Sequence, residues 1–155
     1  MTQVAIKKCN EYNLDLIYEN ITKSIDLINI TNKPLIKEND KVFIKLNLVG
    51  PFEKEKGITT HPVFLKAVIK YVKKYTNNIT VGDNPAVRDQ IFTMKKTGIY
   101  DVIEEEKVKI LDQKNIKTIT YSNYKVYNKF DITSEMVDCD VLINLPKLKT
   151  HSLAY

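Results

Sequence analysis

Apolar segments of strand-like length alternate along this chain with segments whose apolar residues recur at helical spacing. The strand-like segments are residues 4–8, 41–48, 78–81, 108–111 and 139–145. The helical segments are residues 14–28, 62–75 and 88–106, with a short one at 133–137. This alternation predicts a mainly parallel sheet, because parallel neighbours need a crossover that is usually a helix. We therefore expect a single three-layer α/β domain over residues 1–155, with helices on both faces of the sheet.

Local signals predict where several elements begin or end. Asn13 stands at the N-cap position of the first helical segment, and Pro62 lies in the first turn of the second, where proline is tolerated. Gly98 is expected to break the helical segment 88–106. Residues 115–130 are rich in β-branched residues and tyrosine, which favours either a hairpin or short edge strands.

The basic residues of the chain do not form a pattern typical of nucleic-acid binding. The net charge is +5, from 24 lysines and arginines against 19 acids, and Arg88 is the one arginine. Nucleic-acid surfaces usually show clustered basic residues, with arginine favoured for bidentate contacts. The lysines that fall on one helical face are Lys66, Lys70, Lys73 and Lys74. We interpret that face as a solvated outer surface and expect no nucleic-acid partner.

Several features favour a cytoplasmic location. No apolar run approaches the roughly 18 residues of a membrane span, so we expect no membrane partner. The first residues lack the basic stretch, apolar block and cleavage site of a signal peptide. The two cysteines, Cys9 and Cys139, are far apart in the sequence, which predicts buried free thiols in a reducing compartment.

Basic residues follow the last predicted strand at every second position. Lys147, Lys149 and His151 would share one face if the backbone stays extended past Pro146, because the side chains of a strand alternate between its two sides. Two cations and an imidazole on one face are suited to holding an anion. This segment therefore predicts part of an anion site.

Polar residues also lie at the carboxyl ends of two earlier predicted strands. Lys45 and Asn47 interrupt an apolar strand, and Asp83 follows the next one; the alternative for Lys45 is an ammonium that reaches solvent from an edge strand. Open parallel sheets bind ligands beyond this edge, so we predict a site for an anionic small molecule there. The predicted ligand-binding residues are Lys45, Asn47, Thr60, Asn144, Lys147 and Lys149, and His61 or His151 would move a proton.

His61 and Asp83 each allow more than one interpretation. Thr59 or Thr60 could cap the second helix, and His61 would then lie beside its positive end, which favours a neutral imidazole that binds metal or accepts a proton. Alternatively, His61 is incidental to a capping turn. Asp83 could cap a helix, bind a metal or act as a base. The alternative to the anion site is a divalent-metal site, and its ligands, which are also the catalytic candidates, are His61, His151 and Asp83.

Four motifs in the chain are KLNLVG (residues 45–50), GITTHP (57–62), VGDNP (81–85) and INLPKLKTH (143–151). Together they resemble the family known as domain of unknown function 362. By this resemblance, the family's motif positions are occupied by Lys45, Asn47, Thr60, His61, Asp83, Lys147, Lys149 and His151. The resemblance implies an intracellular bacterial or archaeal protein, and many members carry a ferredoxin-like iron–sulfur module after this domain. The family's activity is unassigned, so whether this chain is an enzyme stays open.

The chain departs from the family pattern after its last motif. Members usually continue through a glycine-rich stretch before any cluster-binding cysteines. Two cysteines cannot build a four-cysteine iron–sulfur site, so we expect no cluster within this chain. We expect the N-terminal part of a longer family domain, truncated after KTH, with redox-linked chemistry in full-length relatives. A further hypothesis is a non-catalytic fragment whose unpaired sheet edge favours self-association or a partner that supplies the missing part.

Overall fold

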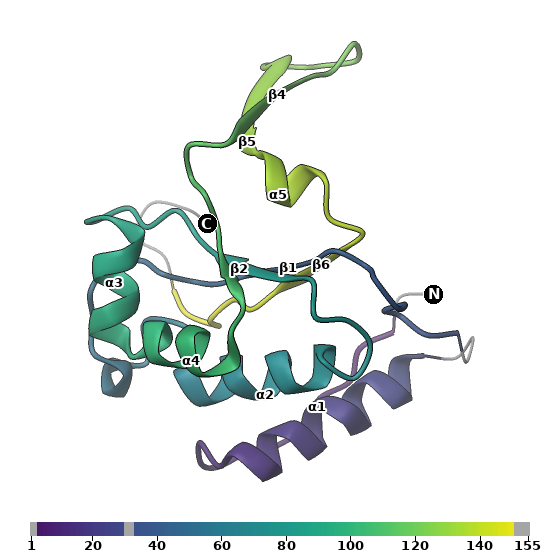
Figure 1. Cartoon of the computed structure of the whole chain (residues 1–155), viewed down its shortest axis with the longest axis vertical. Helices are drawn as coiled ribbons and strands as arrows, with labels where there is room; N and C mark the ends of the chain where they lie inside the picture. Colours follow the sequence, from purple (N-terminus) through teal and green to yellow (C-terminus); the bar gives the residue numbers. More distant parts are fainter. Residues whose placement is uncertain (1–2, 30–32, 151–155) are drawn as a thin grey trace.

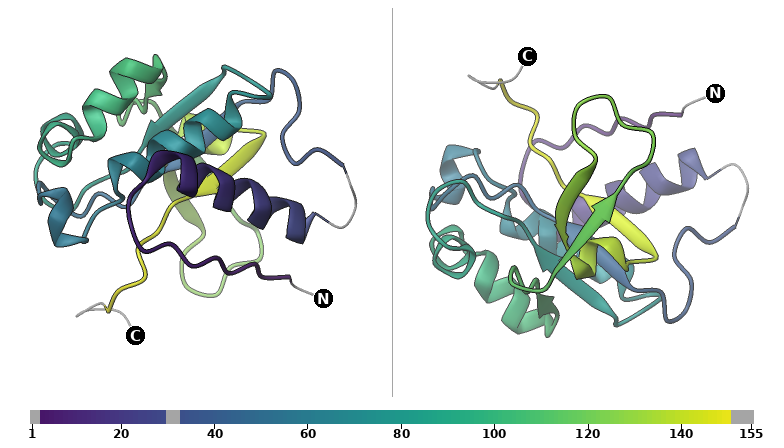
Figure 2. Two further views of the ribbon diagram at one scale, coloured as in Figure 1. Left: turned by 90° about the horizontal axis from the view of Figure 1, so that it is seen from below. Right: turned by 90° about the horizontal axis from the view of Figure 1, so that it is seen from above.

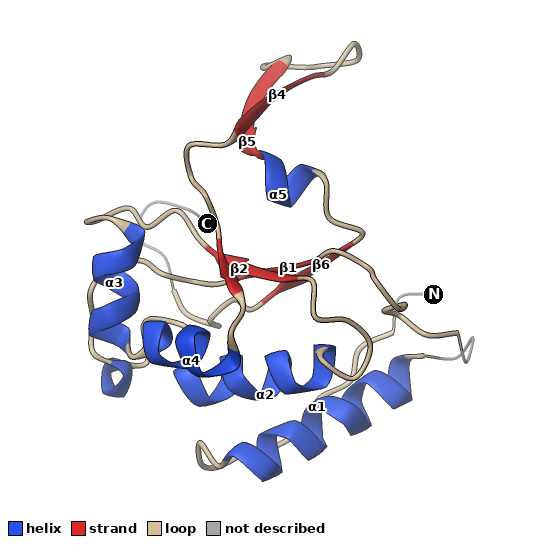
Figure 3. Cartoon of the chain, in the orientation of Figure 1, coloured by secondary structure: helices blue, strands red, loops and turns tan. Residues whose placement is uncertain are grey.

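A four-stranded parallel sheet lies at the centre of the protein, with the strand order β3-β2-β1-β6 (Figures 1 and 3). The computed structural model describes residues 3–29 and 33–150. The strands are β1 (Val42–Lys45), β2 (Ile79–Gly82), β3 (Lys109–Ile110) and β6 (Val141–Asn144). All three pairings are parallel, and β1 pairs with β2 on one side and with β6 on the other. The α/β class predicted from the alternation of segments is confirmed.

One face of the sheet carries the long helices and the main core. The helices are α1 (Leu14–Ile28), α2 (Pro62–Val72), α3 (Gln90–Thr97) and α4 (Ile99–Glu106). In Figure 1, α1, α2 and α4 lie on this side, and α3 stands near one end of the sheet. Because strand side chains alternate, Ile44 and Leu46 point towards α2 and pack in one cluster with Leu65 and Ile69. All four are fully buried.

The opposite face carries a hairpin and one short helix (Figure 2). Strands β4 (Ile116–Thr120) and β5 (Lys129–Thr133) pair antiparallel, and α5 (Ser134–Val137) follows directly. The hairpin interpretation of residues 115–130 and the short helix are thereby confirmed. The expected helices on both faces are present, but very unequally, since α5 has only four residues. This face is therefore less completely covered than the first.

The predicted signals at helix ends are confirmed at three positions. The side-chain oxygen of Asn13 accepts the Leu16 backbone N–H at 3.0 Å and caps α1. Pro62 is the first residue of α2. Gly98 has a φ of 75° and separates α3 from α4, because few other residues adopt this left-handed conformation without strain.

The predicted strand at residues 4–8 is wrong. Val4 is 78% exposed and Ile6 is 87% exposed, and the segment pairs with no described strand. Alternating apolar residues do not make a strand unless a neighbouring edge supplies hydrogen bonds and packing. Cys9 continues the same extended segment and is exposed rather than buried, whereas Cys139 is partly buried; both are free thiols.

Candidate functional site

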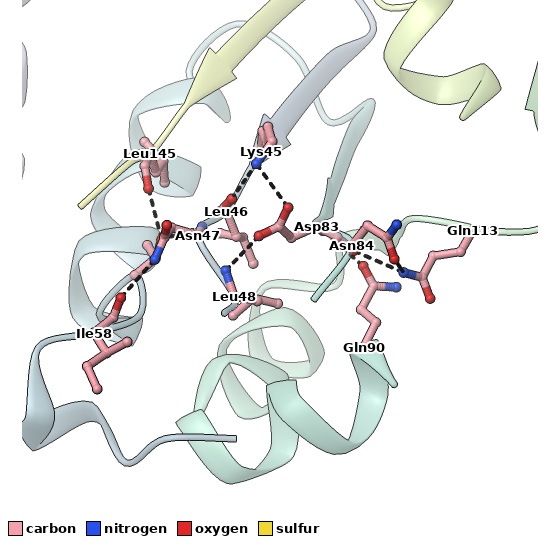
Figure 4. Close-up of polar contacts among 11 residues, drawn as sticks. Lys45, Leu46, Asn47, Leu48, Ile58, Asp83, Asn84, Gln90, Gln113 and Leu145 are labelled. Atoms are coloured by element: carbon pink, nitrogen blue, oxygen red, sulfur yellow. Dashed lines mark hydrogen bonds and ion pairs between the residues drawn. The ribbon is translucent and has the colours of Figure 1, made fainter. Parts of the chain in front are cut away.

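Lys45 and Asp83 form an ion pair at the carboxyl edge of the sheet (Figure 4). Lys45 ends β1, and Asp83 directly follows β2. The Lys45 ammonium lies 2.9 Å from Asp83 Oδ1 and also donates to the Leu46 carbonyl at 3.0 Å. The other oxygen of Asp83 accepts the Leu48 backbone N–H at 2.6 Å. Two predicted site residues thus come together, and each is the other's partner.

Two sequence interpretations of this pair are wrong. Strand β1 has neighbours on both sides, so Lys45 does not reach solvent from an edge strand. Asp83 does not cap the following helix, because Asp89 does so by accepting the Phe92 backbone N–H at 2.8 Å. The Lys45 side chain is 36% exposed and that of Asp83 is 13% exposed, so the pair is partly shielded from water. Such shielding strengthens the attraction between the charges.

Two glutamines that the sequence analysis missed hold the turn after β2. The backbone N–H of Asp83 donates to Gln90 Oε1 at 3.0 Å, and the Gln90 amide donates onward to the Leu111 carbonyl at 3.1 Å. Gln113 donates to the Asp83 carbonyl at 3.2 Å and to the Asn84 side chain at 3.0 Å. Gln90 is the first residue of α3 but is only 3% exposed. A glutamine at a helix start normally faces water, so nothing in the sequence indicated that Gln90 is buried. The contacts of Gln113 were not indicated by the sequence either.

Asn47 and Thr60 tie together the segments that follow β1 and β6 (Figure 4). Thr60 Oγ1 accepts the Asn47 backbone N–H and donates to the Leu145 carbonyl, both at 2.9 Å. The Asn47 amide donates to the Ile58 carbonyl at 2.8 Å. Thr60 is 1% exposed. The polar groups of Asn47 and Thr60 named here therefore make internal contacts that stabilise the edge of the sheet.

His61 itself caps helix α2, so the predicted cap at Thr59 or Thr60 is wrong. His61 Nδ1 accepts the Val63 backbone N–H at 3.2 Å. The imidazole stacks on Tyr12, with ring centroids 3.5 Å apart and an angle of 9° between the planes. Tyr12 lies just before the cap of α1, and nothing in its sequence position predicted this contact.

Lys147 joins the stacked rings from the opposite end of the chain. Its ammonium is 3.2 Å from the Tyr12 hydroxyl oxygen and 5.9 Å from the centre of the Tyr12 ring. Contacts of this kind combine a hydrogen bond with the attraction of a cation for an aromatic face. We call Tyr12, His61 and Lys147 the stacked cluster.

Burial and nearby cations favour the neutral form of His61. Burial lowers the pKa of His61 below its ordinary value, and the charges of Lys54 and Lys147 lower it further. Glu55 acts in the opposite direction but more weakly. Because Nδ1 accepts the hydrogen bond from Val63, the proton of the neutral ring lies on Nε2. His61 therefore offers one N–H donor in a positively charged environment.

The basic segment after β6 is only partly described. Lys147 is partly buried, whereas Asn144 and Lys149 are exposed, and Leu148 between the lysines is fully exposed at 106%. The predicted position of His151 lies outside the described residues. The expectation of one basic face along this segment therefore stays a prediction for Lys149 and His151.

The metal alternative receives no support from the described part of the chain. Across residues 3–29 and 33–150, no group of three or more histidine, cysteine, aspartate or glutamate side chains is placed to hold a metal ion. Both oxygens of Asp83 have partners, and a metal on His61 Nε2 would displace its proton to Nδ1 and break the helix cap. A site that includes His151 stays a prediction.

Fold and site together define an α/β domain with a polar cluster at the carboxyl edge of a parallel sheet. The chain belongs to the family described as Domain of unknown function (DUF362), whose model matches residues 42–155. The match confirms the family resemblance of the four sequence motifs.

A curated relative is a thylakoid-associated protein of Synechocystis sp., which is 27% identical over 117 residues. The aligned region is 76% of this chain but only 36% of that protein, so this chain spans about a third of its relative's length. No solved structure matches the chain. Within the described ranges, no helix combines the length and apolar composition needed to cross a bilayer.

Proposed function

We propose that the carboxyl edge of the sheet binds an anionic small molecule beside the stacked cluster. His61 Nε2 would donate a hydrogen bond to the anion, and Lys147 and Lys54 would neutralise it. Lys45 has a different role, because Asp83 already compensates its charge and the pair fixes the loop that leads to Asn47. Exposed Lys149 and Asn144 are available to the same ligand from the end of β6.

One observation carries this proposal, namely an imidazole that caps an eleven-residue helix through Nδ1 and so leaves Nε2 as the donor, with a pKa lowered by burial and by the charges of Lys54 and Lys147. An anion there is stabilised by the ammonium charges, by the imidazole N–H and by the positive end of the α2 dipole. The same environment disfavours a metal cation. A neutral His61 also avoids adding a third positive charge to those of Lys54 and Lys147.

We expect an anion bound at this position to raise the pKa of His61, because negative charge stabilises the imidazolium form. The probes are inorganic phosphate and pyrophosphate, and the measurement is an NMR pH titration of the His61 ring at constant ionic strength. Lys147→Ala should weaken binding about tenfold, the effect of losing one charge-assisted hydrogen bond. Lys70→Ala is the matched control, because it removes an exposed lysine of helix α2.

An unchanged His61 titration in the presence of both probes contradicts the proposal. Equal affinities of the wild-type and Lys147→Ala proteins would also contradict it. High ionic strength should weaken binding, because counter-ions screen charges that lie near the surface.

We also propose that this site works with an iron–sulfur module in full-length relatives. The two cysteines of this chain cannot supply a four-cysteine cluster, so the electrons would come from another segment or protein. The cytoplasmic location likewise stays a prediction. The name of the thylakoid-associated relative describes that protein and places no constraint on the location of this one.

Self-association is an alternative that one feature favours. Strand β6 borders the sheet, and among the described residues it pairs only with β1. Leu142 on this strand is 49% exposed. An apolar, unpaired edge of this kind is suited to pairing with another chain, as expected for a non-catalytic scaffold.

A further inference from the structure

The second face of the sheet is unusually polar near the amino ends of its strands. Phe43, Thr80 and Lys109 are in register across β1, β2 and β3, so their side chains point to the same side. Lys41 and Asn78 lie two residues earlier in the chain on the same side of β1 and β2. Both faces of a parallel sheet are normally lined by aliphatic residues. Polar residues on this face therefore call for an explanation other than packing.

A cavity of about 350 Å³ lies between this polar surface and helix α5. Its volume is at the lower end of the range for small-molecule sites, about 300 to 1,000 Å³. The Phe43 side chain forms an apolar part of the cavity wall. Its polar lining includes Lys41, Asn78, Thr80, Lys109, Glu135 and Asp138.

Among the charged side chains that line this cavity, Asp138 is ion-paired with Lys117, whereas the other three form no ion pair within the described residues. Glu135 Oε2 is buried and has no hydrogen-bond partner among the described residues. Lys41 and Lys109 form no ion pair with any carboxylate in the described ranges. A buried carboxylate oxygen without a partner is costly, so a native structure that keeps one needs a reason. A ligand that brings complementary groups provides that reason.

We propose that this cavity binds a small molecule that carries an anionic group and, close to it, a hydroxyl or ammonium donor. Lys41 and Lys109 neutralise the anionic group, and Glu135 Oε2 accepts the hydrogen bond from the donor. Phe43 packs against the carbon skeleton. The amides and hydroxyls around the cavity complete the recognition of a polar metabolite rather than an apolar one.

This second site is independent of the stacked cluster. Lys41 and Asn78 precede β1 and β2, so the cavity begins at the amino ends of the strands. The stacked cluster and the Lys45–Asp83 pair lie at the carboxyl ends. An experiment that finds no binding at one site therefore does not argue against binding at the other.

The test is calorimetric titration with glycerol 3-phosphate, L-serine and glycolate, with acetate as the matched control for glycolate. We expect saturable binding of at least one of the first three and at least about tenfold weaker binding of acetate, which lacks the donor. Because serine carries both donors, a preference for serine over glycolate identifies a contribution of the ammonium group, and a preference for glycolate or glycerol 3-phosphate identifies a hydroxyl donor. Absence of saturable binding by all three probes overturns the proposal.

Variants distinguish this cavity from the proposed anion site. Lys109→Ala should weaken binding about tenfold, and Glu135→Gln should reduce the preference for the probe with a donor over acetate. Lys70→Ala, which removes an exposed lysine outside both proposed sites, should leave both quantities unchanged. Lys109 is exposed, so its variant should fold normally, which denaturant unfolding checks. Wild-type affinity in a folded Lys109→Ala protein overturns the proposal, as does an equal loss of affinity in Lys70→Ala.

Discussion

Asp83 takes part in more of the hydrogen bonds described at the carboxyl edge of the sheet than any other residue named there. Its two oxygens hold the Lys45 ammonium and the Leu48 backbone N–H, and its own backbone is held by Gln90 and Gln113. Through its carboxylate and its backbone, Asp83 therefore connects the ends of β1 and β2 with the segments that follow β2 and β3. A charged residue in such a position stabilises the fold whether or not it takes part in chemistry.

We expect Asp83→Ala to lower the free energy of unfolding by about 3 kcal/mol, because it leaves the Lys45 ammonium and the Leu48 N–H without their acceptor. Asp83→Asn should cost less, since one amide oxygen can still accept a hydrogen bond. Urea unfolding followed by circular dichroism measures both. Asp138→Ala is the control: its ion pair with Lys117 is about half exposed and should contribute less than about 1 kcal/mol. Equal losses for Asp83→Ala and Asp138→Ala would contradict this view of the pair.

The position of these site residues could be predicted, but their partners could not. Lys45, Asp83 and Asn144 follow apolar strands, and the rule that parallel strands end at one edge brings them together. Whether Lys45 meets a ligand or Asp83 depends on the path of the loop after β1, which no spacing in the sequence specifies. His61 illustrates the same limit on predicting side-chain partners from sequence. A threonine before a helix is a better N-cap by type, but only the histidine has the required position.

At the scale of elements, the Leu111 side chain, just after β3, packs directly against Gly82 at the end of β2. A Cβ atom on Gly82 would lie 2.3 Å from the Leu111 Cβ and 2.8 Å from Gln90 Oε1. The Leu111 N–H donates to the Val81 carbonyl at 2.9 Å and extends the pairing of these strands beyond the two residues of β3. Glycine is therefore required here by a neighbouring strand and not by its own backbone angle.

Gly82→Ala should destabilise the protein by about 3 kcal/mol, the upper end of the cost of overpacking a core. The added methyl group must displace Leu111, so amide hydrogen exchange at Leu111 should become faster than in the rest of the sheet. Gly57→Ala is the control, because a Cβ there meets nothing within 4 Å although its φ of 65° strains it. That variant should lose some stability without faster exchange at Leu111. Unchanged protection of Leu111 in Gly82→Ala would contradict the proposed contact.

Long, strongly periodic elements were predictable, and short or partner-dependent ones were not. Helix α1 begins and ends where its apolar spacing and Asn13 cap predicted. Residues 4–8 show the same alternation as a real strand but meet no edge, which is a property of the whole fold and not of five residues. The expected strand at 108–111 is reduced to Lys109–Ile110, which pairs with Thr80 and Val81 of β2.

At the scale of the whole molecule, the two faces of the sheet differ in how they are filled. The α2 face is a continuous apolar core, whereas the α5 face holds a polar cavity and the hairpin. Stability comes mainly from the first face, because buried apolar area is the largest favourable contribution to folding. Because the second face contributes less to stability, it can carry charged groups and needs fewer helices to cover it.

The stability of the whole protein should depend on the protonation of His61. Its pKa in the folded state is lower than the ordinary value of 6.5, so the unfolded state binds more protons between the two values. This contribution to the free energy of unfolding is complete above about pH 6.5 and decreases as the pH falls towards the folded-state pKa. Denaturant unfolding between about pH 5 and pH 8, a range that includes the ordinary histidine pKa of about 6.5, measures it.

The His61→Asn variant isolates this contribution, because asparagine is a good N-cap and has no titrating group. We expect the variant to keep α2 and to lose stability less steeply than the wild type as the pH falls. His151 is present in both proteins, so its titration cancels in the comparison. Identical pH dependence in the two proteins would show that the His61 environment does not couple to folding.

The contact between Tyr12 and Lys147 joins residues 135 positions apart in the chain. During synthesis, the first helices and strands can therefore collapse around β1 and α2 long before the second of these residues has been added. Contacts across so many residues carry a large loop-closure entropy and form late. The imidazole at the start of α2 can stack on Tyr12 as soon as residue 61 has emerged, but the Lys147 ammonium joins these rings only after residue 147 has followed, so a shorter nascent chain can fold its core and still lack this cation of the proposed site.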